Sequence, residues 1–126
     1  MERVCFQLQV RPERLQEYRE RHAAVWTSVL EAIRDSGRRN YSLFLREDGL
    51  LIGYYETDDD AESQRSLAEN PATAPWEAQM AGFFVDVDGR PDQGAPRLAE
   101  IFNLDDQLAA ARPAPTLPSS TQRDTP

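Results

Sequence analysis

The only histidine of the chain, His22, lies four residues after Tyr18 and four residues before Trp26. On a helix this spacing places the three side chains on adjacent turns of one face. An imidazole exchanges protons near neutral pH, and a tyrosine hydroxyl both donates and accepts hydrogen bonds. The same spacing is also typical of a buried packing stripe, in which the histidine would have no chemical role.

Two more aromatic residues could join His22. Tyr41 lies in the next apolar segment, and Trp76 opens a later helical segment. If these residues converge between helix and sheet, they offer a flat apolar wall, two hydroxyls and one group able to exchange protons. This composition suits a neutral ligand that is rich in hydroxyl groups.

The motifs of several other chemistries are absent from the sequence. It has no P-loop, no GxGxxG, no GxSxG and no paired histidines. The lone Cys5 has no second cysteine with which to form a disulfide or a thiolate metal site. We therefore expect no metal and no cofactor. The net charge of -8 argues against nucleic acid as a partner, because that binding depends on neutralising phosphates.

The N-terminal residues "MERVCFQLQV" lack the basic and apolar regions of an export signal. No apolar run reaches the roughly 18 residues that a membrane span requires. We expect a cytoplasmic protein that does not bind a membrane.

The elements that must position these residues can be predicted from hydrophobic patterns. Residues 4–10 alternate between apolar and other side chains, which predicts a strand. Pro12 and Gly37 are typical of the start and end of a helix, and His22 lies on the apolar face between them. Residues 40–45 and 50–56 predict two strands joined by a tight turn at Asp48 and Gly49.

The second half of the chain predicts more helices and a last strand. The stretch from Thr57 to Asp60 is typical of a helix N-terminus. Prolines within residues 70–75 divide that helical region into two pieces, and Pro75 fits the first turn of the second piece. Residues 97–102 predict a final strand.

The order β-α-β-β-α-β indicates an α+β, ferredoxin-like fold, with an antiparallel four-stranded sheet and helices on one face. The strands predicted at residues 40–45 and 50–56 carry large apolar residues on both sides, so we expect a homodimer formed by sheet-on-sheet contact, a dimeric α/β barrel. Residues 1–105 are predicted to form the domain. Residues 106–126 are rich in Pro, Ser and Thr and predict a flexible tail.

The stretches "EYRERHAAVW", "NYSLFL", "PWEAQM" and "LAEIFNLD", in this order, resemble the L-rhamnose mutarotase family over about residues 1–105. The resemblance implies a small dimeric enzyme, an isomerase, that interconverts the α and β anomers of L-rhamnose without a cofactor. It implies that His22 is the proton donor and that Tyr18, Tyr41 and Trp76 bind the sugar. Glu77 stands where family members commonly have a second tryptophan, so we expect it to contact the sugar and to affect the choice of sugar.

Mutarotation needs one proton donor and one proton acceptor. His22 can fill either role. The group that fills the other role is water, a tyrosine hydroxyl or Glu77, and we prefer water or a tyrosine hydroxyl. Two other functions remain as alternatives: a cofactor-independent monooxygenase of the same dimeric barrel architecture, and a non-catalytic module that binds a small ligand.

Overall fold

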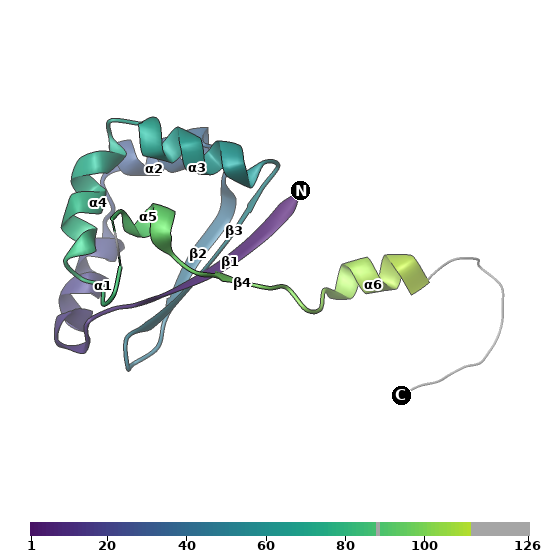
Figure 1. Cartoon of the computed structure of the whole chain (residues 1–126), viewed down its shortest axis with the longest axis horizontal. Coiled ribbons are helices and arrows are strands. Elements are labelled where there is room, and N and C mark those ends of the chain that lie inside the picture. The colour runs from purple at the N-terminus through teal and green to yellow at the C-terminus, as the bar shows by residue number, and fades with distance from the viewer. Residues whose placement is uncertain (88, 112–126) are drawn as a thin grey trace.

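The computed structural model describes residues 1–87 and 89–111 of the chain (Figure 1). Its strands are β1 (Glu2–Gln9), β2 (Arg39–Leu45), β3 (Leu50–Thr57) and β4 (Arg97–Leu98). Its helices are α1 (Leu15–Ala23), α2 (Thr27–Asp35), α3 (Asp60–Glu69), α4 (Thr73–Ala81), α5 (Pro91–Gly94) and α6 (Leu104–Ala111), with a 3₁₀ turn at Pro12–Arg14.

The four strands form one antiparallel sheet in the order β2-β3-β1-β4. Helices α1 to α5 lie on one side of this sheet, whereas α6 extends away from the body of the molecule (Figure 1). The predicted ferredoxin-like α+β arrangement is therefore confirmed.

The hydrophobic core lies between the sheet and the helices. Alternate residues of β1 and β3 are buried on the helix side, as the period of two predicts. The core combines these strand residues with helix and loop residues, namely Val4, Phe6, Leu8, Val10, Tyr18, Val29, Leu51, Tyr55, Trp76, Met80, Phe83 and Phe84. Several of these side chains leave the space between them unfilled, which creates the cavity described below.

The turn between β2 and β3 is the predicted hairpin. Gly49 has a φ of +99°, a conformation that glycine adopts at little cost, and its N–H donates to the Arg46 carbonyl at 2.9 Å. Asp48 Oδ1 accepts from the backbone N–H of Leu50 at 3.2 Å. The turn sets the register that carries Tyr41 and Tyr55 to the helix side of the sheet.

The prediction of one helix between Pro12 and Gly37 was wrong, because the chain leaves the helical conformation between α1 and α2. Ala24 (φ -147°, ψ 71°) and Trp26 (φ -55°, ψ 136°) are both non-helical. At this break the Trp26 ring lies 5.1 Å from the Trp76 ring in a T-shaped contact. The Trp26 carbonyl then accepts the first backbone hydrogen bonds of α2. No proline or glycine lies between α1 and α2, so the break coincides with this aromatic contact rather than with a helix-breaking residue.

The later elements differ from the prediction in two ways: the last strand is shorter, and the helices α5 and α6 were not predicted. The second helical region is divided into α3 and α4, and Asp59 caps α3 by accepting from the backbone N–H of Glu62. The last strand has only the two residues of β4 instead of residues 97–102, because only Cys5 and Phe6 of β1 pair with it. Beyond Leu98 the chain turns away, and Glu100 forms an ion pair with Arg3.

The predicted domain boundary at residue 105 falls within α6, and residues 112–126 of the predicted tail lie outside the described residues. The separate flexible tail thus stays a prediction. In the described part of the chain, every helix is too short or too polar to span a bilayer.

Candidate active site

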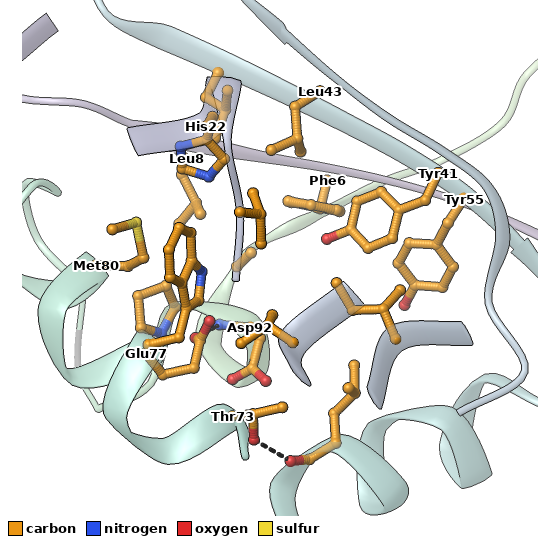
Figure 2. Close-up of a pocket in the computed structure, with 18 of the residues that line it drawn as sticks. Phe6, Leu8, His22, Tyr41, Leu43, Tyr55, Thr73, Glu77, Met80 and Asp92 are labelled. Atoms are coloured by element: carbon orange, nitrogen blue, oxygen red, sulfur yellow. Dashed lines mark hydrogen bonds between the residues drawn. The ribbon is translucent and has the colours of Figure 1, made fainter. Parts of the chain in front are cut away.

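A cavity of about 440 Å³ lies between the sheet and the helices (Figure 2). Its volume is in the range typical of small-molecule sites. All five residues predicted from the sequence line it, namely Tyr18, His22, Tyr41, Trp76 and Glu77. Figure 2 shows His22 and Glu77 on one side of the cavity, with Tyr41 and Tyr55 on the other.

His22 lies in the last turn of α1 and is half-buried against aromatic rings. Its ring stacks on Tyr18 at 4.1 Å and meets Trp76 edge-on at 5.5 Å. Its Nδ1 lies 3.0 Å from the Tyr18 carbonyl oxygen. Because a carbonyl only accepts, Nδ1 carries the hydrogen, and in the neutral ring Nε2 is left with a lone pair. Burial lowers the pKa of His22, while the bond to Tyr18 opposes this shift.

The hydroxyls of Tyr18 and Tyr41 stay protonated at neutral pH. Burial raises the pKa of Tyr18, with smaller contributions from Tyr41 and Glu77. Burial also raises the pKa of Tyr41, to about 12, although Arg38 opposes the shift. Both hydroxyls can therefore donate hydrogen bonds to a ligand and accept them, but neither is a strong base or acid.

Trp76 supplies the apolar wall of the cavity. It is buried at the start of α4, where Trp26 and His22 both contact it edge-on. Met80, one turn further along α4, continues the wall. A rigid indole surface of this kind packs well against the apolar faces of a sugar ring.

Glu77 brings a carboxyl group to this otherwise apolar wall. Its Oε1 accepts the backbone N–H of Asp92 at 2.8 Å. Burial and then the charge of Asp92 raise the pKa of Glu77 to about 8, although the N–H bond and Arg90 oppose this shift. Glu77 is therefore a neutral carboxylic acid at neutral pH.

The structure adds charged residues that the sequence reasoning missed. Asp92 of α5 lines the cavity and forms an ion pair with Arg90 at 3.1 Å. Arg38 is 5 % exposed, and its guanidinium lies 3.9 Å from the Tyr55 ring centre while its Nε donates to Ser63. Asp92 follows a proline in what the sequence shows as an ordinary turn, so no local signal placed it at the cavity.

The described residues offer no obvious metal centre: no cluster of three or more His, Cys, Asp or Glu side chains there could hold an ion. The fold and the cavity together define a small ferredoxin-like protein with an acid/base site for a ligand that carries hydroxyl groups.

Comparison with known proteins gives the particular family. A family model described as L-rhamnose mutarotase matches residues 3–104. The chain belongs to the L-rhamnose mutarotase family.

Individual relatives agree with this assignment. L-rhamnose mutarotase of Bacillus subtilis (strain 168) is 33% identical over 107 residues, covering 83% of this chain and 100% of the relative. That of Jannaschia sp. (strain CCS1) is 34% identical over 105 residues, covering 82% and 99%. The crystal structure of an L-rhamnose mutarotase from Formosa agariphila has a TM-score of 0.67 and 27% identity, covering 82% of this chain and 99% of that one.

A second solved structure is similar in fold alone. Tetracenomycin F2 cyclase from Streptomyces glaucescens has a TM-score of 0.53 at 17% identity, covering 82% of this chain and 97% of that one. A shared fold does not by itself imply a shared function, so the residues of the cavity must decide the function.

Proposed function

We propose that this chain is a mutarotase that interconverts the α and β anomers of L-rhamnose or a similar deoxy sugar. The observation that carries this proposal is the convergence of Tyr18, His22, Tyr41 and Trp76 on one cavity, in a chain that belongs to the family. The site combines an acid/base group, two neutral hydroxyls and an apolar wall, and mutarotation needs little else.

The reaction opens and recloses the sugar ring. The ring oxygen gains a proton as the anomeric hydroxyl loses one, the bond between C1 and the ring oxygen breaks, and C1 becomes an aldehyde. Rotation about C1–C2 then allows reclosure on the other face, with both proton transfers reversed. His22 takes part in these transfers, and a positioned acid/base group of this kind contributes about 10²- to 10⁴-fold to a rate.

The other cavity residues bind the sugar. Tyr18 and Tyr41 hydrogen-bond to its hydroxyls, and Trp76 packs against its apolar surface. Glu77 also contacts the sugar, at the position where family members commonly have a second tryptophan. The carboxyl group of Glu77 and the charged groups of Asp92 and Arg38 make the cavity a poor fit for the electron-rich aromatic substrate of a cofactor-independent monooxygenase.

Proton NMR tests the activity directly. L-rhamnose at anomeric equilibrium is irradiated at one anomeric proton while the signal of the other is recorded. We expect saturation to transfer between the two signals with the protein and much less in its absence. No transfer above the spontaneous rate would exclude L-rhamnose as a substrate, and oxygen consumption with an aromatic substrate would indicate the monooxygenase instead.

We also propose that the protein acts as a homodimer. On the sheet face that the helices leave uncovered, Phe44 is 64% exposed and pairs with Ile52, and Tyr54 pairs with Cys5. The segment after β4, which includes α6, carries four more exposed apolar residues, Ile101, Phe102, Leu104 and Leu108. A second copy supplies a matching apolar surface to both, which supports sheet-on-sheet association.

A further inference from the structure

The cavity contains a pair of neighbouring carboxyl groups. Glu77 and Asp92 both line the cavity, and the backbone N–H of Asp92 binds Oε1 of Glu77. The Asp92 carboxylate is held by two nitrogens of Arg90, at 3.2 and 3.1 Å. Within residues 1–87 and 89–111 no arginine forms an ion pair with Glu77. Two adjacent carboxyls resist ionising together, and only Asp92 pairs with an arginine, so the pair favours the protonated form of Glu77.

The hydrogen bond of His22 makes that residue a proton acceptor. Its Nδ1–H is committed to the Tyr18 carbonyl, so the neutral ring presents only the lone pair of Nε2. An imidazolium would have to form next to Trp76 and Tyr18, where burial disfavours a charge. In ring opening a neutral His22 can therefore remove a proton from the sugar but not supply one, the reverse of the donor role that the resemblance implies, so another group must donate.

The remaining candidates for the donor can be compared by acidity. The hydroxyls of Tyr18 and Tyr41 are weaker acids than an ordinary tyrosine, since burial raises the pKa of each. The Asp92 carboxylate already forms an ion pair with Arg90. Among the described residues that line the cavity, Glu77 is thus the strongest acid that still holds its proton near neutrality.

We propose that Glu77 is the second acid/base residue of mutarotation and gives its proton to the ring oxygen of the sugar while His22 removes the proton of the anomeric hydroxyl. This inference rests on the proposed mutarotase activity. Opening leaves Glu77 as a carboxylate and His22 as an imidazolium; on reclosure the carboxylate takes back the proton from the ring oxygen and the imidazolium returns its proton to the anomeric oxygen. Each catalytic cycle therefore restores both groups.

The pH dependence of the rate follows from the groups that face Glu77. These are Asp92 of α5, Arg90 just before it, Tyr18 and His22 of α1, and Tyr41 of β2. With a pKa of about 8, Glu77 is protonated below that pH, so the rate should fall as the pH rises through about 8. At low pH the rate should fall again as His22 becomes protonated.

The test compares the wild type with Glu77→Gln, Glu77→Asp and Asp92→Asn by saturation transfer across this pH range, with the spontaneous rate subtracted. Glutamine keeps the shape and the acceptor oxygen for the Asp92 N–H but has no proton to transfer. We expect Glu77→Gln to lower kcat at least about 100-fold with little change in KM and to abolish the alkaline fall. Glu77→Asp should restore part of kcat.

Asp92→Asn is the matched control, because it keeps the backbone N–H and Glu77 but removes the neighbouring charge. Its alkaline fall should move to a lower pH. A Glu77→Gln rate within about tenfold of the wild type, with the alkaline fall unchanged, would overturn the role of Glu77 while leaving the mutarotase activity in place. A wild type without activity would instead refute the proposed function.

A second measurement does not depend on how the variants fold. The ¹³C signal of the Glu77 carboxyl in the wild type, identified by its absence from either Glu77 variant, can be followed with pH. A midpoint near pH 8 is expected from the carboxyl pair. A midpoint near 4.5, the ordinary value, would overturn the proposal.

Discussion

At the scale of residues, the site depends on two groups whose environments shift their proton affinities in opposite directions. The pKa of His22 is lowered by burial among aromatic rings, whereas that of Glu77 is raised by burial and by Asp92. The result at neutral pH is a neutral base and a neutral acid in one cavity. Such pairs are a common way for proteins to run acid and base chemistry together.

The raised pKa of Glu77 also affects stability. The folded protein holds this proton up to about pH 8 and the unfolded chain releases it near 4.5, so the free energy of unfolding should fall as the pH rises from 4.5 to 8. Between pH 7 and 8, above the ordinary pKa of histidine, the decrease is at most about 1.4 kcal/mol per pH unit. Urea unfolding at pH 7 and 8 measures it.

Glu77→Gln is the control for this prediction, since glutamine has no titrating proton. Its free energy of unfolding should change less between pH 7 and 8 than that of the wild type. Equal changes in the two proteins would mean that Glu77 ionises normally in the folded state.

The sequence predicts which aromatic residues and which histidine line the cavity, but it does not predict the charged residues around them. The spacing of Tyr18 and His22 on one helix is a local signal, and the structure brings both to the cavity. Asp92 and Arg38 reach the same cavity from distant segments, and only the tertiary fold brings them there. The environment that shifts the pKa of Glu77 could not be predicted for the same reason.

At the scale of elements, the order of strands and helices followed from alternation, glycines and prolines, because each of these acts within a few residues. The break between α1 and α2 had no such signal. It is associated with the contact of Trp26 with Trp76, which are far apart in sequence. The shortness of β4 likewise reflects its few partners on β1.

The sheet positions Tyr41 through one close contact. Gly53 of β3 pairs with Phe6 of β1, and a Cβ at Gly53 would lie 2.1 Å from the Phe6 ring. That ring in turn contacts Tyr41 edge-on at 6.3 Å. The absence of a side chain at Gly53 therefore lets Phe6 lie where it supports a wall of the cavity.

Gly53→Ala should force the Phe6 ring to move and lower the free energy of unfolding by about 1–3 kcal/mol. Gly82→Ala is a suitable control, because its nearest neighbour is the flexible end of Arg14 at 3.2 Å. Urea unfolding of the two variants should show a clearly larger loss for Gly53→Ala. Similar, small losses would show that the Phe6 ring is not confined by Gly53.

At the scale of the whole molecule, the uncovered sheet face and the segment after β4 predict association. Phe44→Asp places a charge on the uncovered sheet face in place of an exposed aromatic ring, so it should convert a dimer to a monomer at micromolar concentration in sedimentation equilibrium. Leu30→Asp is the control: Leu30 is 51% exposed but lies on α2, on the helix side, and its substitution should leave the mass unchanged. A monomeric wild type would contradict the dimer.

The central claim is that His22 moves protons during anomer exchange. The most direct measurement is saturation transfer between the two anomeric protons of L-rhamnose, with wild-type protein and with His22→Ala, after circular dichroism has shown that both are folded. The account predicts rapid transfer with the wild type and a rate lowered about 10²- to 10⁴-fold, close to the spontaneous rate, with His22→Ala. Equal transfer with both proteins would contradict the account, because His22 would then have no part in the chemistry.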